Sequence, residues 1–236
     1  MTLRQAQDRL AFGFDFDHTL GVDNGLELQA LYAYAEELGR PLDPQDPVWR
    51  TRLETLLAEF RADATTMDEM IRGFGAALGL RESHAERWRE ICYGRVDAMV
   101  RPVDGACELL AVLRACGIPA AILTNGWTPL QQKKIARALG DEGRALRVLV
   151  SDALHAVKPQ RAAFDALVDV LDMPRERVWY VGDNARGDVG GALAAGLRAV
   201  WFDPDGQGYP QDLPPPTLRI GSLRELETLI ENGIAP

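Results

Sequence analysis

The sequence is poor in several features that would mark particular classes of protein. Its 236 residues include only three cysteines and three histidines. Cys92, Cys107 and Cys116 are odd in number and lack the spacing of a metal site, which indicates reduced thiols rather than disulfides or a zinc centre. No apolar run approaches membrane-spanning length, and the N-terminal segment lacks the apolar core of a signal peptide. We therefore expect a cytoplasmic protein with no membrane partner.

Positive charge is also scarce. There are 26 Lys and Arg residues against 35 Asp and Glu, which gives a formal net charge of −9. Because a broad nucleic-acid surface needs clustered basic side chains, we expect no nucleic-acid partner. A small anionic substrate would gain no attraction from the overall charge. A phosphate site must therefore make its own positive field from a metal, a lysine and backbone N–H groups.

What the sequence does have is a repeated order of apolar run, polar residues and helical pattern. The run 10–14 ends in two acids, and later runs have the same plan; they are 118–123, 147–150, 178–181 and 199–202. Helical patterns lie between these runs, for example at 107–113 and 164–171. This alternation predicts an α/β fold, a doubly wound, Rossmann-like parallel sheet with helices on both faces. Ligands bind such sheets at the carboxyl ends of the strands.

One interval breaks the alternation. From about Gly25 to Arg95 the apolar residues recur with helical spacing throughout. The chain is long enough for a core domain that carries a smaller insert. We predict a helical cap domain at residues 22–100, inserted in an α/β core formed by residues 1–21 and 101–236. A last short strand is expected at 218–220, followed by a terminal helix.

Asp15 and Asp17 follow the first predicted strand. In extended backbone, residues two apart point to the same face, and two close carboxylates repel unless a cation or a shared proton relieves them. Mg²⁺ prefers such oxygen ligands. Taken alone, however, the pair is better explained by an acidic strand end that caps the next element.

Polar residues after the other strands strengthen the metal and phosphate interpretation. Thr124 supplies a hydroxyl, and Asn125-Gly126 supplies backbone N–H groups at a loop where a phosphate can bind. Lys158 precedes Pro159 and a helical segment, and Asp183 and Asp188 follow a further strand. Each of these residues alone has a structural explanation at least as good.

The order of these motifs is what resembles a known family. Asp-x-Asp-x-Thr, Leu-Thr-Asn-Gly, Lys-Pro and Gly-Asp-x-x-x-x-Asp, each after its own strand, resemble the haloacid dehalogenase-like (HAD) hydrolase superfamily. The resemblance covers nearly all of the chain outside the insert, which itself resembles the helical C1-type cap of subfamily I. It departs at Gly187, where many members have Asn. The resemblance implies a Mg²⁺-dependent phosphatase acting on a small phosphorylated metabolite through an aspartyl-phosphate.

The resemblance also implies a role for each residue. Asp15 is the expected nucleophile, and Asp17 would protonate the leaving group and then accept a proton from water. Four residues would bind the phosphoryl oxygens; they are Thr124, Asn125, Gly126 and Lys158. The expected metal ligands are Asp15, Asp17 through its backbone carbonyl, Asp183 and Asp188, the last through water or by orienting Lys158.

Several alternatives stay open. A sugar-phosphate mutase would use the same residues and return the phosphoryl group to a second hydroxyl. A 2-haloacid dehalogenase is disfavoured because its first motif normally lacks the second Asp, here Asp17. A silent metal-binding module is disfavoured because the motif residues are all present. For His18 a steric or hydrogen-bonding role is favoured over catalysis. The substrate is not decided, and a monomer or weak dimer is expected.

Overall fold

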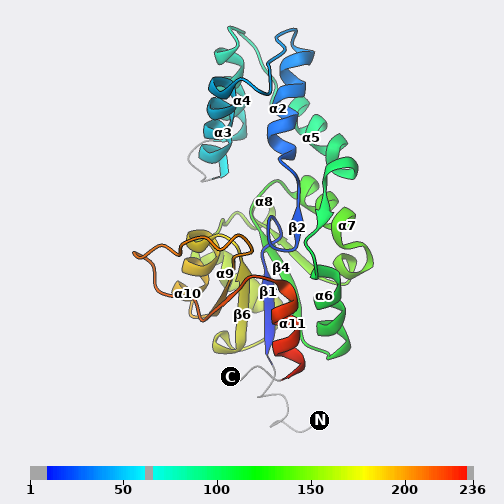
Figure 1. Cartoon of the computed structure of the whole chain (residues 1–236), viewed down its shortest axis with the longest axis vertical. Helices are drawn as coiled ribbons and strands as arrows, with labels where there is room; N and C mark the ends of the chain where they lie inside the picture. The colour runs from blue at the N-terminus through cyan, green and yellow to red at the C-terminus, as the bar shows by residue number, and fades with distance from the viewer. Residues whose placement is uncertain (1–9, 62–65, 233–236) are drawn as a thin grey trace. The chain divides into compact units, whose positions relative to one another are not determined.

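The computed structural model describes residues 10–61 and 66–232 (Figure 1). The chain divides into two units, one formed by residues up to Val22 and from Arg101 onward, the other by Asp23–Val100. Among the described residues, no helix combines the length and the apolar character that a membrane span requires.

A six-stranded sheet forms the centre of the first unit, in the order β5-β4-β1-β6-β7-β8, and every neighbouring pair is parallel. Its strands are β1 (Ala11–Phe14), β4 (Ala120–Thr124), β5 (Arg147–Val150), β6 (Val178–Gly182), β7 (Arg198–Phe202) and β8 (Leu218–Ile220). From β1 the chain builds outward through β4 and β5, then crosses back to build β6, β7 and β8 on the other side. The order therefore reverses at β1, and the loops after β4, β1 and β6 meet where ligands bind such sheets.

Helices cover both faces of this sheet. They are α6 (Ala106–Ala115), α7 (Thr128–Arg144), α8 (Ser151–Leu154), α9 (Arg161–Leu171), α10 (Gly191–Ala194) and α11 (Leu223–Glu231), with a 3₁₀ turn at Arg175–Arg177 and a π turn at Ala185–Gly190. Helices α9 and α10 pack together on one side of β1, and α6 and α11 pack together on the other (Figure 1). The predicted doubly wound α/β fold is confirmed.

Close packing at β1 depends on a glycine. A Cβ at Gly13 would lie 2.8 Å from Cδ2 of Tyr180 and would also collide with Leu167 of α9. Both of these side chains are fully buried. Glycine at this strand position thus lets α9 and the Tyr180 ring lie directly against β1, beneath the residues that follow the strand.

Strand β4 begins two residues later than the sequence pattern suggested. The apolar run was expected to start at residue 118, whereas β4 starts at Ala120 and extends to Thr124. The N–H of Ile118 donates to Leu113 O and so belongs to the end of α6. Pro119 has no N–H to give to a sheet ladder. The boundary therefore moves by two residues, and Thr124 becomes the last residue of the strand.

In the second unit, every regular element formed by the described residues is a helix. The helices are α2 (Leu26–Glu37), α3 (Pro47–Arg61), α4 (Met67–Ala77) and α5 (Ala85–Met99). Apolar faces of all four helices meet in a core that includes Leu31, Leu53, Phe74 and Trp88. A short antiparallel ribbon of β2 (Gly21–Val22) and β3 (Arg101–Pro102) lies in the first unit where the chain leaves and re-enters it.

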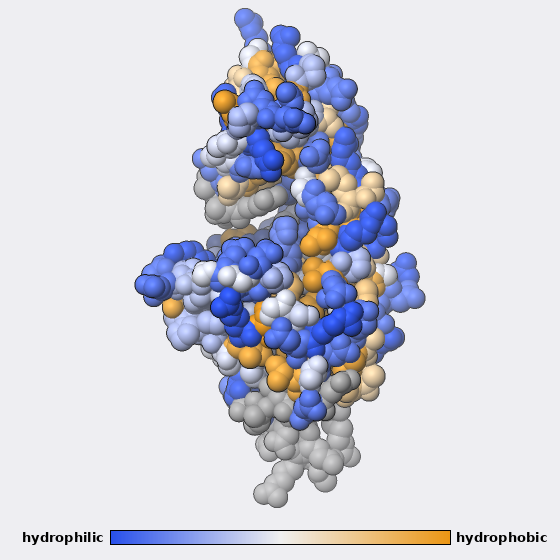
Figure 2. Space-filling model, in the orientation of Figure 1, coloured by the Kyte–Doolittle hydropathy of each residue, from blue (hydrophilic) through white to orange (hydrophobic). Residues whose placement is uncertain are grey.

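The visible surface is largely hydrophilic (Figure 2), as expected for a chain in which 26% of the residues are charged. Among the side chains that the structure describes, the large apolar ones that are exposed lie on four different helices; they are Val48, Tyr93, Val170 and Leu229. Single exposed apolar residues of this kind are normal on soluble domains and do not mark a binding surface.

Candidate active site

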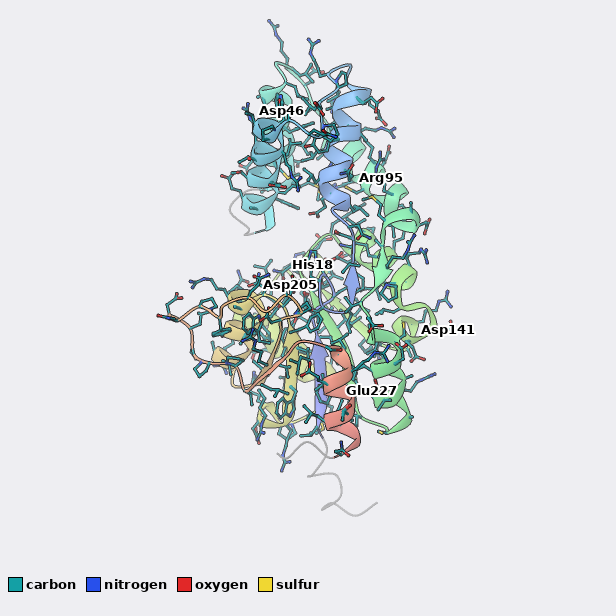
Figure 3. The ribbon with its side chains drawn as sticks, viewed as in Figure 1. His18, Asp46, Arg95, Asp141, Asp205 and Glu227 are labelled. Carbon is teal, nitrogen blue, oxygen red and sulfur yellow. The ribbon has the colours of Figure 1, made fainter. Side chains whose placement is uncertain are left out.

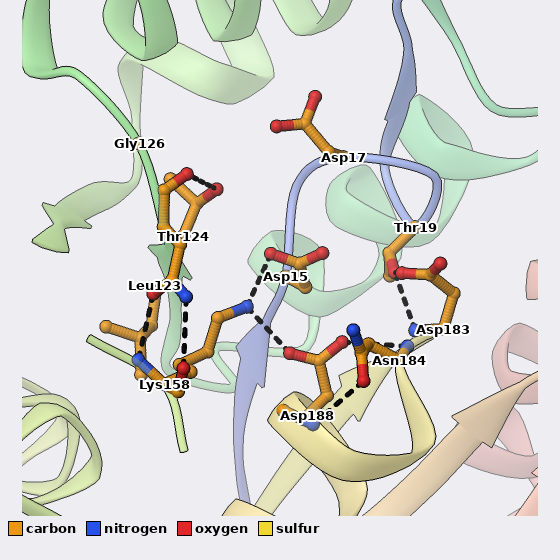
Figure 4. Close-up of polar contacts among 12 residues, drawn as sticks. Asp15, Asp17, Thr19, Leu123, Thr124, Gly126, Lys158, Asp183, Asn184 and Asp188 are labelled. Atoms are coloured by element: carbon orange, nitrogen blue, oxygen red, sulfur yellow. Dashed lines mark hydrogen bonds and ion pairs between the residues drawn. The ribbon is translucent and has the colours of Figure 1, made fainter. Parts of the chain in front are cut away.

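The predicted site residues lie at the carboxyl edge of the sheet (Figure 4). Asp15 follows β1, Thr124 ends β4 and Asp183 follows β6. Lys158 lies in the turn before α9, and Asp188 lies in the π turn after β6. Parallel strands bring residues that are more than 140 positions apart in sequence, such as Asp15 and Lys158, into direct contact.

Lys158 is the central cation of this group. Its Nζ donates to Asp15 Oδ1 at 2.6 Å, to Asp188 Oδ1 at 2.7 Å and to Tyr180 Oη at 3.0 Å. The side chains of Lys158, Asp15 and Asp188 are only 5%, 9% and 2% exposed. Since an ammonium has three N–H groups, all of its donors are engaged. The buried lysine therefore fixes the orientation of two carboxylates.

Two neighbours hold Lys158 in this place. The Asn125 side chain accepts from the Lys158 N–H at 2.9 Å and donates to the Lys158 carbonyl at 3.1 Å. Tyr180, which is fully buried on β6, accepts from the ammonium and donates its own O–H to the Leu123 carbonyl at 2.7 Å. The Asn125 amide thus links the loop after β4 to the loop that carries Lys158.

Three carboxylates form a cluster beside Lys158. Asp15, Asp183 and Asp188 each offer one oxygen, and these oxygens lie within 4.8 Å of one another. The Asp183 N–H donates to Thr19 Oγ1 at 3.1 Å, and the Asp188 carboxylate accepts from the Asn184 N–H at 3.0 Å. With Lys158 the ionised group carries three negative charges and one positive charge. A divalent cation would balance that charge, and an all-oxygen donor set suits Mg²⁺.

Burial makes this cluster costly to ionise without a cation. Burial raises the pKa of Asp15 to about 7, with the charges of Asp188 and Asp17 adding to the effect and Lys158 opposing it. Burial and then the charge of Asp15 raise the pKa of Asp183 to about 6. Burial likewise raises the pKa of Asp188, again against Lys158. The cluster therefore binds protons near neutral pH when no metal ion is present.

This arrangement predicts a pH-dependent response to Mg²⁺. Because the folded pKa values of Asp15 and Asp183 lie above the ordinary 3.8, the native state binds protons that the unfolded state releases. Stability in EDTA should be greatest at acid pH and fall as the pH rises through about 6 and about 7. We expect Mg²⁺ to raise the melting temperature by several degrees at about pH 8, and much less at about pH 5, where protons compete.

Thermal unfolding with EDTA or Mg²⁺ at the two pH values measures this response. Asp183→Asn is the matched control, because it removes one carboxylate and should weaken the Mg²⁺ response at the higher pH. An equal Mg²⁺ effect at both pH values would contradict the prediction.

The Asp17 side chain has different partners from Asp15. It is 29% exposed and points away from Lys158 (Figure 4). Its Oδ2 accepts from Gln131 Nε2 at 2.7 Å, and its Oδ1 forms an ion pair with Lys134 Nζ. Asp17 is thus bound by α7, outside the cluster of three carboxylates. That its backbone carbonyl reaches the metal stays a prediction.

The loop after β4 is held by its own neighbours. Thr124 Oγ1 accepts from Gln131 Nε2 at 2.8 Å, and the Gly126 N–H donates to Ser151 Oγ at 3.0 Å. Gly126 has φ 138, and a Cβ there would come within 3.0 Å of Gln131 Cγ. Glycine is therefore needed for the Gln131 side chain to pass. Since the Gly126 N–H is engaged by Ser151, its predicted role as a phosphate donor stays a prediction.

His18 lies in the tight turn between β1 and β2 (Figure 3). Its φ is 61, and its N–H donates to the Gly21 carbonyl at 2.7 Å. The side chain is exposed, and its charge opposes the rise in the pKa of Asp183. In the structure, His18 thus contributes to the turn through its backbone.

Comparison with known proteins decides the family. The model of a hydrolase family described as haloacid dehalogenase-like hydrolase matches residues 10–196. The chain belongs to this family. Membership confirms the resemblance that the four motifs indicated.

Curated relatives of this HAD-like hydrolase match it over part of their length. Pyrimidine 5'-nucleotidase YjjG of Escherichia coli is 32% identical over 152 residues, which cover 64% of this chain and 63% of the relative. Phosphoserine phosphatase of Thermus thermophilus is 38% identical over 119 residues, 50% of this chain and 46% of the relative. The matched parts thus span roughly half to two thirds of these relatives.

Solved structures match nearly the whole chain. The putative HAD-hydrolase YfnB of Bacillus subtilis, solved with magnesium bound, has a TM-score of 0.74 and 23% identity, covering 94% of this chain and 98% of that one. L-2-haloacid dehalogenase of Xanthobacter autotrophicus has a TM-score of 0.70 and 20% identity, covering 96% and 100%. At such identities these likenesses show the fold.

Sequence reasoning missed several residues that this HAD-like hydrolase places around the predicted ones. Tyr180 was part of an apolar run, and its hydroxyl gave no local signal. Gln131 and Lys134 are both 2% exposed. A signal was available for these two, since helical spacing puts them on the same face of α7 as the buried Ile135 and Ala138. Polar residues at core positions of a helix point to a buried polar partner.

Proposed function

We propose that this HAD-like hydrolase is a Mg²⁺-dependent phosphatase that acts in the cytoplasm on a small phosphorylated metabolite, through an aspartyl-phosphate on Asp15. The observation that carries the proposal is the buried contact of Lys158 with both Asp15 and Asp188, beside a cluster of three carboxylates. The pyrimidine nucleotidase and phosphoserine phosphatase among its relatives support a phosphate monoester as substrate.

In the first step, the Asp15 carboxylate attacks phosphorus in line with the leaving oxygen. The new bond joins a carboxylate oxygen of Asp15 to phosphorus as the bond from phosphorus to the leaving oxygen breaks. Lys158 holds Asp15 Oδ1 at 2.6 Å and so limits rotation of the nucleophile. Asp17 gives its carboxyl proton to the leaving oxygen, which departs as an alcohol.

In the second step, a water molecule attacks the phosphorus of the aspartyl-phosphate. Asp17, now ionised, takes a proton from that water, and the bond between Asp15 and phosphorus breaks. The products are inorganic phosphate and the free Asp15 carboxylate. One residue therefore serves as acid and then as base, and the site returns to its starting state.

Charge on the transferred group needs neutralisation in both steps. Asp15, Asp183 and Asp188 would hold Mg²⁺, which supplies a positive charge at the phosphoryl oxygens. Lys158 and the Thr124 hydroxyl would bind the same oxygens, together with N–H groups of Asn125 and Gly126. Because all three Lys158 donors are engaged, a phosphoryl oxygen would have to replace one of its three present acceptors.

The helical unit formed by Asp23–Val100 would act as a cap that excludes water and chooses the leaving group. Caps of this kind favour small metabolites over phosphorylated proteins. Nucleoside monophosphates, sugar phosphates and phosphoserine are therefore the first substrates to test.

A panel of these phosphate esters, assayed with Mg²⁺ and with EDTA, tests the proposed function. An activated aryl phosphate and a 2-haloacid complete the panel. We expect phosphate release that requires Mg²⁺ from at least one metabolite and from the aryl ester, and no halide release. If no member of the panel yields phosphate, or if halide is released instead, the phosphatase proposal is wrong.

A further inference from the structure

Helix α7 presents two buried polar side chains to Asp17. Gln131 and Lys134 are one helical turn apart, and each is only 2% exposed. Gln131 Nε2 donates to Asp17 Oδ2 at 2.7 Å, and Lys134 Nζ pairs with Asp17 Oδ1. Each oxygen of the Asp17 carboxylate therefore has its own partner on α7.

The Gln131 amide also contacts the loop after β4. Its Nε2 lies 2.8 Å from Thr124 Oγ1 and 2.9 Å from the Asn125 carbonyl oxygen, so its two hydrogens are shared among three acceptors. Gly126 leaves the space that this side chain fills. One amide thus connects Asp17 to Thr124, which lie at the ends of different strands.

The two buried lysines bind different carboxylates. Lys158 binds Asp15 and Asp188, whereas Lys134 binds Asp17. A buried ammonium requires a charged or hydrogen-bonding partner, and this requirement ties the Asp17 carboxylate to α7. The arrangement keeps that carboxylate out of the cluster formed by Asp15, Asp183 and Asp188.

We propose that Gln131 and Lys134 are positioning residues that hold the Asp17 carboxyl where it can exchange a proton with the leaving oxygen. This inference rests on the proposed phosphatase function and adds two residues to it. As the bond from phosphorus to the leaving oxygen breaks, the proton moves from Asp17 to that oxygen. An alkoxide needs this proton, whereas an activated aryl oxide is stable as an anion and leaves without it.

The dependence on the leaving group supplies the test. Gln131→Ala and Lys134→Met should lower kcat for an alkyl phosphate by about 10- to 100-fold, which is part of what general acid–base catalysis contributes. For an activated aryl phosphate, the rate of the first step, measured as the burst of aryl oxide release, should change by less than about threefold, because acid catalysis contributes little to that step. The chain offers matched controls in the adjacent residues, and Gln132→Ala and Lys133→Met should leave both substrates unaffected.

A double-mutant comparison separates positioning from a general structural role. In an Asp17→Asn background, Gln131→Ala and Lys134→Met should cause no further loss on the alkyl ester, because they act through Asp17. If Lys134→Met does not fold, Gln131→Ala decides the matter alone, with circular dichroism as the check on its fold.

Three results would overturn the inference while leaving the phosphatase function intact. These are an equal loss of the first-step rate on both esters, no loss on either ester, and a full further loss in the Asp17→Asn background. A wild-type protein inactive on both esters would overturn the inference and the proposed function together.

Discussion

Asp15→Asn should lower kcat for every phosphate ester by more than about 10⁴-fold, the scale on which enzymes lose activity when a covalent nucleophile is removed. Asparagine has nearly the same shape and can still accept from Lys158 Nζ, but its neutral amide does not attack phosphorus. The loss should be similar for alkyl and aryl esters, because both require the nucleophile. This pattern differs from that expected for Gln131 and Lys134.

Acid quenching and mass spectrometry of the protein measure the covalent step directly. Wild-type protein mixed with an aryl phosphate should carry a phosphoryl group, and Asp15→Asn should carry none. Asp17→Asn is the matched control: it should still form the aspartyl-phosphate from the aryl ester and accumulate it, because the base for the second step is missing. Full activity of Asp15→Asn would rule out the covalent mechanism and leave direct attack by water.

Loss of activity in Asp15→Asn should not reflect loss of the fold. The substitution removes one of three crowded carboxylates and leaves the contact between Lys158 and Asp188 in place. Burial and the neighbouring acids already make an ionised Asp15 unfavourable without metal. In EDTA at about pH 8, the variant should therefore melt no lower than the wild type.

The fold could be predicted from the sequence because each strand is a short apolar run that ends at polar residues. The runs 147–150 and 218–220 coincide with β5 and β8. The helical patterns between the earlier runs favoured parallel pairing, since parallel strands need a crossover connection that is long enough to hold a helix. The bounds of β1, β6 and β7 differ by one residue at one end, and the largest difference is the start of β4, where Pro119 and the end of α6 interrupt the ladder.

Only part of the site could be predicted from the sequence. Residues at strand ends, such as Asp15 and Asp183, could be found because their position along the chain also fixes their position at the edge of the sheet. Gln131 and Tyr180 lie inside regular elements, and what their polar atoms contact depends on which strands and helices become neighbours. That information is tertiary, and no local pattern contains the distance from Gln131 to Asp17.

Lys158→Met should combine a large loss of activity with a pH-dependent loss of stability. Removing a charged donor that stabilises phosphoryl oxygens should lower kcat by about 10³-fold, because single neutral donors are already worth 10²–10³. The variant also leaves Asp15 and Asp188 buried without their cation. Breaking a buried ion pair from one side costs about 3–5 kcal/mol when the remaining charges stay ionised.

That stability cost should grow with pH. The charge of Lys158 lowers the pKa of both Asp15 and Asp188, so its removal raises both values further. Below the wild-type pKa values the carboxyls are neutral in both proteins and the lost ion pair matters little. As the pH rises above those values, the folded variant still retains protons that its unfolded state has released, so its stability continues to fall while that of the wild type no longer does. Urea unfolding in EDTA at about pH 5 and about pH 8 should show the larger difference from wild type at the higher pH.

Tyr180→Phe provides the matched comparison for Lys158→Met. It removes one 3.0 Å contact of the ammonium and the hydroxyl bond to Leu123, but it keeps the charge between Asp15 and Asp188. We expect a stability loss nearly independent of pH between 5 and 8, since no charge is lost. If Lys158→Met behaves in the same pH-independent way, Lys158 is not the cation that balances these two carboxylates. The difference in pH dependence between the two variants thus reports the effect of the Lys158 charge.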